Sequence, residues 1–310
     1  MPKVTVIVPN YNHAPFLRQR IDTILNQSFQ DFELIILDDC STDNSQEIIE
    51  SYRHNPHVTH VIYNEVNGGT PFKQWNKGIR LAKGEWIWIA ESDDFADEHF
   101  LESLLCSAQT YEDVGFAFAW TYYVNAESQV IGRNGDLDCS NTNPVVHKSK
   151  DFIRKRVFIR ETIDNVSECI FKKGLFVPSN TTMYDNMKLC GDWFFYVLLI
   201  EQTDVLELKT PLSYYRKHSY NTVIKTEHEG RTFLEGMSVY NYITTNILHP
   251  NQHDFKEMAK YWIENRKIYD YSDETNKNVR ALFLKNYPMV VFYYYVVPLW
   301  RKIKSIIKLQ

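Results

Sequence analysis

The chain has 310 residues, of which 44% are hydrophobic and 15% aromatic, enough for one large domain or for a domain with a substantial appendage. Its 34 basic and 39 acidic residues give a net charge of −5 at pH 7. Proteins that bind nucleic acid neutralise phosphates with an excess of basic residues, so we expect no nucleic-acid partner.

The five cysteines are scattered and odd in number, and they include no Cys-x-x-Cys pair, so the sequence predicts neither a disulfide framework nor a zinc site. The amino-terminal stretch MPKVTVIVPNYN holds a short apolar run followed at once by polar residues, which is typical of a first strand rather than of a signal peptide. We therefore expect a cytoplasmic protein.

Strand and helix patterns alternate through the first hundred residues. Strands are predicted at KVTVIV, FELIILD, VTHVIY and EWIWIA, with helices over about 15–27, 44–54 and 72–83 between them. This alternation predicts a mostly parallel sheet flanked by helices, a Rossmann-like α/β fold.

A polar cluster follows each of these four strands. The clusters are, in order, PNYN, DDCSTD, NEVNGG and ESDD. Each is also an ordinary turn composition, but ligands of open α/β sheets bind outside the carboxyl ends of the strands, so together the clusters predict one site.

Beyond Asp97 the pattern is looser. We expect a helix over about 98–110, a strand at VGFAFAWTYYV, a polar loop near 132–144, helices at VSECIFKKGLF and CGDWFFYVLLIEQ, and a strand with a loop at LELKTPLSYYRKHSYNTV. Helical patterns dominate from about Arg231 onward.

The carboxylates after the fourth strand have two interpretations. Glu91, Asp93 and Asp94 offer the hard oxygen ligands that Mg²⁺ and Mn²⁺ prefer, and such ions complete their shells with water and substrate phosphates. The alternative is a simple turn or helix cap.

The edge of the sheet where these strands end is called the rim below. Two other sets of polar residues at the rim each have two interpretations. Asp38 and Asp39 can accept the imide N–H of a uracil or the hydroxyls of a ribose, or can cap the next helix. Lys73, with Lys77 and Arg80 nearby, can meet a diphosphate or can simply be a solvated surface lysine.

Four motifs in this order, VTVIVPNYN, LDDCSTDNS, NGGTPFKQWNKGIRLAKGEWIWIAESDD and CGDWFF, resemble family 2 glycosyltransferases of the GT-A fold, over about residues 3 to 220. The resemblance implies that Pro9, Tyr11 and Asn12 line a nucleotide pocket and that Asp39 binds the base, with Asp38 nearby.

The resemblance also implies roles for the acids of the second half. Asp93 becomes the principal metal ligand, and Glu91, standing where the family has the first aspartate of D-x-D, reaches a ribose hydroxyl or a metal-bound water. Asp192 matches the catalytic base, with Gly191 in place of the usual acidic neighbour.

A downstream segment, YYRKHSYNT, resembles a family loop that can close on the diphosphate. It makes Arg216 a candidate for a diphosphate contact and His218 a candidate metal ligand, although a lone histidine in a loop is more often structural.

The function implied is the metal-dependent, inverting transfer of a hexosyl or N-acetylhexosaminyl group, with Mn²⁺ or Mg²⁺, from a UDP-sugar to a cell-surface or lipid-linked glycan. A sugar nucleotidyltransferase is an alternative, but it needs a glycine-rich, basic loop that PNYNHAPF lacks. A non-catalytic glycan binder would not need the acids of all these motifs.

The expected organisation is a GT-A catalytic domain over 1–225, with a nucleotide-binding half (1–105) and an acceptor half (106–225), and a helical extension over 226–310. The tail 287–310 joins aromatic and apolar residues to four basic ones, Arg301, Lys302, Lys304 and Lys308. This composition favours a peripheral membrane anchor. A helix docked on the protein, or on a second subunit in a homodimer, remains the alternative.

Overall fold

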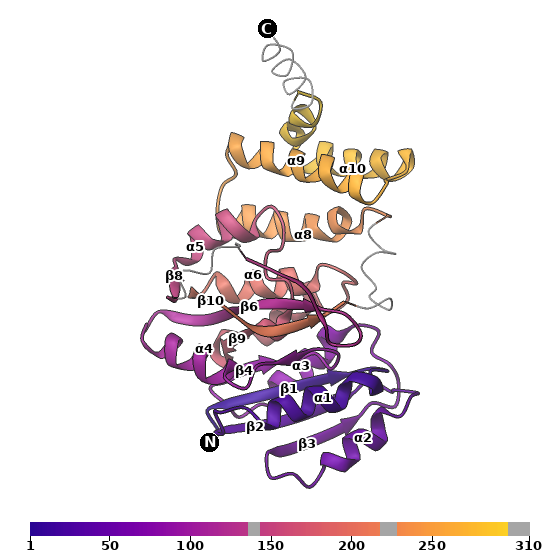
Figure 1. Ribbon diagram of the computed structural model, residues 1–310. Coiled ribbons are helices and arrows are strands. Elements are labelled where there is room, and N and C mark those ends of the chain that lie inside the picture. The colour runs from indigo at the N-terminus through magenta and orange to yellow at the C-terminus, as the bar shows by residue number, and fades with distance from the viewer. Residues whose placement is uncertain (136–142, 218–227, 297–310) are drawn as a thin grey trace. The chain divides into compact units, whose positions relative to one another are not determined.

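The computed structural model describes residues 1–135, 143–217 and 228–296 (Figure 1). They belong to two compact units, the first formed by 1–152 and 163–219, the second by 153–162 and 220–310. The boundary expected at residue 225 lies outside the described residues, and the assignment of 153–162 to the second unit has no counterpart in the sequence-based prediction.

The first unit holds the strands. In chain order these are β1 (Val4–Asn10), β2 (Phe32–Asp38), β3 (Val58–Tyr63), β4 (Trp86–Ile89), β5 (Phe95–Ala96), β6 (Val114–Val124), β7 (Val130–Arg133), β8 (Val145–His147), β9 (Cys169–Lys172) and β10 (Asp204–Arg216).

The helices of the first unit are α1 (Ala14–Leu25), α2 (Ser45–Tyr52), α3 (Pro71–Leu81), α4 (Phe100–Gln109), α5 (Ser149–Phe152) and α6 (Gly191–Ile200). Short 3₁₀ turns at Val166–Glu168, Lys173–Leu175 and Pro178–Met183 connect β9 to its neighbours along the chain.

Within the described residues the strands form one ten-stranded sheet, in the order β3-β2-β1-β4-β9-β6-β10-β5, with β7 beside β6 and β8 beside β10. The first four strands of this order are parallel. The chain order reverses between β1 and β4, and such a switch point is where open α/β sheets bind ligands. The predicted α/β fold class is confirmed.

Both faces of this sheet are covered because its central strands are buried and mainly apolar. Val4, Val6 and Val8 of β1 belong to a buried cluster with α1 and α4. Ile7 faces the other way, against α3, where a Cβ on Gly78 would lie 2.5 Å from its side chain. Glycine at 78 therefore lets α3 approach β1 closely.

One helix prediction is wrong. The segment VSECIFKKGLF contains strand β9, which pairs antiparallel with both β4 and β6. An apolar run as short as Cys169–Phe171 does not distinguish helix from strand, and its place between two strands that are distant in sequence decides the outcome.

The second unit is helical in its described part, as predicted. It contains a short π-helix (Ile153–Val157) and the helices α8 (Arg231–Asn246), α9 (Gln252–Ile268) and α10 (Asp273–Asn286). Residues 288–296 are also helical. No helix among the described residues is long and apolar enough to cross a membrane.

Two contacts explain why 153–162 belongs to this unit. Arg154 donates to Asp254 Oδ2 at 2.6 Å, and Tyr240 Oη donates to the carbonyl of Ile159 at 2.7 Å. Trp262 of α9 is buried between the rings of Phe283, at 5.3 Å, and Tyr294, at 3.9 Å. The start of the carboxyl-terminal tail is thus packed on α9.

Candidate active site

The ends of β1 and β2 are tied together by a buried polar network. Asn10 Nδ2 donates to Asp38 Oδ1 at 2.8 Å, and the Ser41 hydroxyl donates to the same oxygen at 2.6 Å. Asn12, at φ +57°, accepts from the N–H of Thr42 at 2.7 Å. Asp38 and Asn12 therefore shape the rim, and Asp38 does not cap α2, whose cap position is Asn44.

Pro9 and Tyr11 lie on either side of this network. Pro9 is paired in register with Leu37 of β2, whereas the pairing of β1 with β4 ends at Ile7. Proline lacks an N–H, so it is tolerated where one neighbour strand has ended. Tyr11 follows with 46% of its surface exposed and lies at the rim.

Asp39 is buried at the end of β2 and organises the loop before α3. Its two oxygens accept the N–H of Gly68, at 3.0 and 2.9 Å, and Oδ1 also accepts from Asn64 and Gln74, at 2.6 and 2.7 Å. Lys73 is exposed beside this loop and donates to the carbonyl of Gly68 at 2.9 Å. The carboxylate of Asp39 thus fixes the loop that borders the rim.

The carboxylates after β4 differ in environment. Glu91 is partly buried and accepts from Trp75 Nε1 at 2.7 Å; burial, with the charge of Asp93, raises its pKa to about 8. Asp94 is fully buried and accepts from Asn165 Nδ2 and the Ser167 hydroxyl, at 2.7 and 2.8 Å. Asp94 is therefore turned into the protein and joins β4 to the segment before β9.

Asp93 is partly exposed between these two acids. The turn that carries it is fixed to β10, because Arg216 donates from its backbone N–H to Asp94 Oδ1 at 2.9 Å and from Nε to the carbonyl of Asp93 at 2.7 Å. The turn interpretation and the ligand interpretation of ESDD are compatible, since Asp94 holds the turn and Asp93 is partly accessible.

Arg216 itself is buried, and its guanidinium lies over the ring of Phe16, 4.6 Å from the ring centroid. It donates to four further oxygens, those of Asn125, Ala126, Ser128 and Gln19. This geometry gives Arg216 a structural role, and a diphosphate contact would require exchanging these bonds. His218, the other candidate of that segment, lies outside the described residues.

Helix α3 contacts all three acidic motifs. Its Gln74 donates to Asp39, and its Trp75 donates to Glu91. Its Phe72 packs against Gly191, where an added Cβ would lie 2.2 Å from the Phe72 ring. The missing acidic neighbour of Asp192 therefore has a physical reason, because no side chain fits at residue 191.

Asp192 lies in the first turn of α6, after the cap residue Cys190, and its Oδ1 accepts the N–H of Trp193 at 2.8 Å. The positive end of a helix dipole stabilises an ionised carboxylate there. Asp192 and Asp93 share one neighbourhood, since both charges act on the phenol of Tyr215, whose pKa is raised chiefly by burial and then by Asp94, Asp93 and Asp192.

Sequence reasoning missed several residues of this site. Tyr215 lies among the acids, His13 Nδ1 is 2.8 Å from the hydroxyl of Ser92, and Trp75 holds Glu91. Ser92 stands within ESDD and His13 directly follows PNYN, so their positions were a usable signal. Trp75 and Tyr215 also stand within matched segments, but their side chains gave no signal, because aromatic residues in a helix or strand are usually core.

The site fits a divalent ion only in part. Within the described residues, no group of three or more His, Cys, Asp and Glu side chains is placed to hold a metal. The charge of Asp93 nevertheless contributes to the raised pKa of Glu91, so the two carboxyl groups interact, and one or two carboxylates are sufficient for Mg²⁺ when substrate phosphates complete the shell.

The fold and the site define a doubly wound α/β protein with carboxylates at the ends of the strands beside its switch point. The sequence model of the family described as glycosyl transferase family 2 matches residues 5–170, more than half of the chain. The chain therefore belongs to glycosyl transferase family 2, and the resemblance inferred from its motifs is confirmed.

Similar curated proteins match between a third and two fifths of the chain. Glycosyltransferase GlyG of Streptococcus pneumoniae is 39% identical over 106 residues, 34% of this chain and 35% of that protein. TuaG of Bacillus subtilis, a putative teichuronic acid biosynthesis glycosyltransferase, is 34% identical over 122 residues, 39% of this chain and 47% of that protein. The matches thus span less than half of these relatives.

A solved structure extends the likeness in fold. Residues 1–349 of Staphylococcus aureus TarS, in complex with UDP-GlcNAc, superpose with a TM-score of 0.65 and 18% identity, covering 91% of this chain and 81% of that one. At this identity the likeness shows the fold alone.

Proposed function

We propose that the chain is a metal-dependent inverting glycosyltransferase that moves a hexosyl or N-acetylhexosaminyl group from a UDP-sugar to a cell-surface or lipid-linked glycan. Mn²⁺ or Mg²⁺ is the proposed cofactor. The proposal rests first on membership of glycosyl transferase family 2.

The observation that carries the proposal is the position of α3. Three residues within its first turns, Phe72, Gln74 and Trp75, contact Gly191, Asp39 and Glu91 in turn. One helix thus contacts the proposed nucleobase site at Asp39, the proposed metal site at Glu91 and the residue beside the proposed catalytic base, Asp192. Its positive amino-terminal end, at Pro71 after the cap residue Thr70, favours a negatively charged diphosphate nearby.

The named relatives support the choice of donor and acceptor. TarS is a poly(ribitol-phosphate) β-N-acetylglucosaminyltransferase, 35% identical over 104 residues, 33% of this chain and 18% of that protein. Its structure holds UDP-GlcNAc, and TuaG is named for teichuronic acid biosynthesis. These names favour a UDP-sugar donor and an acceptor in the cell envelope.

In the proposed reaction, Pro9, Tyr11 and Asn12 border the nucleotide, and the Asp39 loop contacts its base, with Asp38 holding the rim. Asp192 removes the proton from the acceptor hydroxyl. The acceptor oxygen then bonds to the anomeric carbon while the bond from that carbon to the diphosphate oxygen breaks, releasing UDP. Attack from the opposite face inverts the centre, so an α-linked donor gives a β-glycoside.

Asp93 would hold the metal, and Glu91 would contact a metal-bound water or a ribose hydroxyl. When bound, the ion supplies Lewis-acid stabilisation of the negative charge on the diphosphate. Lys73 is proposed as a second contact for that charge, because its ammonium lies beside the Asp39 loop at the start of α3.

We also propose that the protein works in the cytoplasm and associates peripherally with the membrane through the end of its tail, where a lipid-linked acceptor is within reach. The described start of the tail supports a docked helix for residues 288–296, because Tyr294 stacks on Trp262. The basic residues that favour a lipid surface all follow this stretch.

Thermal unfolding with nucleotide sugars tests the proposal. A ligand that binds only the folded state raises the midpoint of unfolding. We expect a UDP-sugar with Mn²⁺ to raise it more than either alone, and slow release of UDP from the matching donor. No shift with any UDP-sugar and metal, together with no release, would refute the proposed donor.

A further inference from the structure

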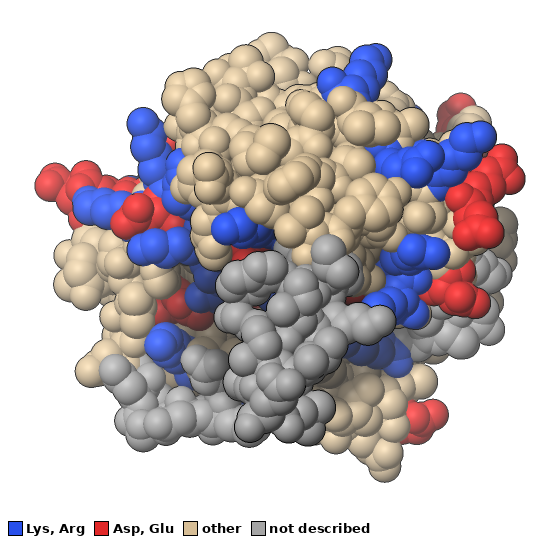
Figure 2. Space-filling model, turned by 90° about the horizontal axis from the view of Figure 1, so that it is seen from above, with Lys and Arg blue, Asp and Glu red and all other residues tan. Residues whose placement is uncertain are grey.

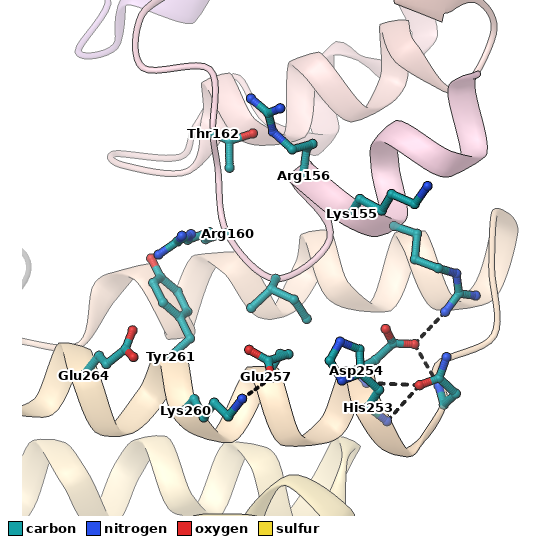
Figure 3. A pocket seen from close by; sticks show the side chains of 13 residues that line it. Lys155, Arg156, Arg160, Thr162, His253, Asp254, Glu257, Lys260, Tyr261 and Glu264 are labelled. Atoms are coloured by element: carbon teal, nitrogen blue, oxygen red, sulfur yellow. Dashed lines mark hydrogen bonds and ion pairs between the residues drawn. The ribbon is translucent and has the colours of Figure 1, made fainter. Parts of the chain in front are cut away.

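The second unit contains a cavity of about 800 Å³ between the segment 153–162 and α9 (Figure 3). All of its lining residues belong to this unit, so the cavity is separate from the acidic rim of the first unit. Nothing in the proposed transfer reaction uses it.

The lining has an excess of positive charge. Five cationic side chains (Arg154, Lys155, Arg156, Arg160 and Lys260) stand against three carboxylates (Asp254, Glu257 and Glu264). On the face shown in Figure 2, basic side chains are interspersed with acidic ones.

Two of the three carboxylates are already paired with cations of the lining. Arg154 binds Asp254 at 2.6 Å, and that carboxylate also caps α9 by accepting from the backbone of Asn251 at 2.8 Å. Glu257 is paired with Lys260. Of the lining carboxylates, Glu264 is the one whose charge these pairs leave to oppose an incoming anion.

Three further residues of the lining offer groups that a ligand could contact. The hydroxyl of Thr162 is buried without a hydrogen-bond partner in the described part of the chain. Arg160 is exposed and makes no ion pair with a described residue. Figure 3 shows the ring of Tyr261 beside Arg160, which provides an apolar surface next to the cations.

We propose that this cavity binds a phosphate ester of a sugar or polyol. Arginine forms paired, charge-assisted hydrogen bonds to phosphate, so Arg156 and Arg160 would hold the anion while Thr162 donates its unused hydroxyl. A volume of about 800 Å³ exceeds what one phosphate needs and leaves room for a carbohydrate against Tyr261 and Ile159. The phosphate can belong to a soluble ester or to a lipid headgroup.

Calorimetry on the full chain tests this with inorganic phosphate, glycerol 3-phosphate and glucose 6-phosphate, with glycerol and glucose as uncharged controls. We expect the two esters to bind and the uncharged compounds not to. Arg160→Gln should weaken binding about tenfold or more, because a charge-assisted hydrogen bond is lost. Thr162→Val should weaken it less.

Lys277→Gln is the matched control, because Lys277 is an exposed cation of α10 that does not line the cavity. It should leave ester binding unchanged. Equal losses in Lys277→Gln and Arg160→Gln, or no ester binding in the unaltered protein, would overturn the proposal. UDP affinity, measured on the same variants, should stay constant, so failure here is distinguishable from failure of the proposed donor site.

Vesicles identify the source of the phosphate. Sedimentation with phosphatidylglycerol vesicles that depends on Arg160, with no such dependence for phosphatidylcholine, would assign the site to a lipid headgroup. Ester binding that depends on Arg160 without vesicle binding would assign it to a soluble phosphate ester.

Discussion

The carboxylate of Asp39 accepts hydrogen bonds from three residues, and both of its oxygens are used by the N–H of Gly68. A nucleotide base that bonds to Asp39 must share these acceptors. The rim loop and the base would then be coupled, since the same carboxylate that positions the loop also meets the ligand.

Asp39→Asn should therefore affect the loop and the ligand together. An amide nitrogen in place of one oxygen removes one of the two acceptors of the partly buried Gly68 N–H, which costs about 0.5–1.5 kcal/mol. We expect urea unfolding to show this loss and calorimetry to show weaker UDP binding. Asp31→Asn, at an exposed carboxylate, should change stability by no more than about 0.5 kcal/mol.

Asp192→Asn separates catalysis from helix structure. Asparagine retains an oxygen that can accept from the N–H of Trp193, as Asp192 Oδ1 does at 2.8 Å. It cannot take a proton from the hydroxyl of the acceptor substrate. We expect transfer to fall by about 10²–10⁴ with UDP-sugar affinity preserved. Asp185→Asn, on the preceding loop, is the control, and near-normal transfer in Asp192→Asn would remove this residue from the mechanism.

Asp93 and Glu91 should differ in their effect on the metal. Asp93→Ala should abolish the gain in UDP affinity that Mn²⁺ provides, because Asp93 is the proposed principal metal ligand and is partly exposed. Glu91→Gln keeps an oxygen for Trp75 Nε1 and should retain most of that gain. Calorimetry with and without Mn²⁺ decides, and an unchanged gain in Asp93→Ala would place the ion elsewhere.

Helices α3 and α6 approach each other closely, because residue 191 of α6 is a glycine. The Phe72 ring occupies the space of a side chain at residue 191, and Trp75 packs 5.5 Å from Phe195 of α6. The start of α6, and with it Asp192, is thereby fixed to the helix that contacts Asp39 and Glu91.

Gly191→Ala should destabilise the first unit by about 1–3 kcal/mol through overpacking against Phe72. Gly174→Ala is the control, because an added Cβ there meets no atom within 4 Å. Combining Gly191→Ala with Phe72→Leu should recover part of the loss, as a double-mutant cycle in urea would show. Additive losses would mean that the two residues are not coupled.

The elements differ in how well their sequence predicts them. β1, β2 and β4 were predictable because seven, seven and four consecutive buried residues leave no polar face. β9 was not, since its four residues become a strand only through pairing with β4 and β6. The π-helix at 153–157 likewise depends on contacts with α9 that lie far along the chain.

The candidate site also has features that the sequence predicted and features that it did not. Motifs at strand ends were predictable because parallel strands bring their carboxyl ends to one edge. The direction of each carboxylate was not, because Asp94 turns inward only after Asn165 and Ser167 reach it, and Arg216 becomes structural only when β10 passes the same turn.

The described start of the carboxyl-terminal tail has both buried and exposed hydrophobic side chains. Val290 and Tyr294 are buried in the second unit, whereas Phe292 and Tyr295 are each 55% exposed. The docked-helix alternative is therefore supported for this stretch, while membrane binding stays a prediction about the residues after it.

Two truncations separate these roles. Removing 297–310 should leave the stability of the protein nearly unchanged and release it from anionic liposomes in a sedimentation assay. Removing 288–310 also removes the ring that stacks on Trp262 at 3.9 Å and should lower the unfolding temperature. Full-length protein that ignores anionic liposomes at low salt would rule out the anchor.

The place of β9 beside β4 has a consequence for how the protein is made. During synthesis β1 to β4 leave the ribosome early, but the second edge of β4 has no partner until residues 169–172 follow. An apolar strand with an open edge is prone to pair with other chains. The nascent amino-terminal half should therefore depend on chaperones, and a fragment ending near residue 105 should aggregate when expressed alone.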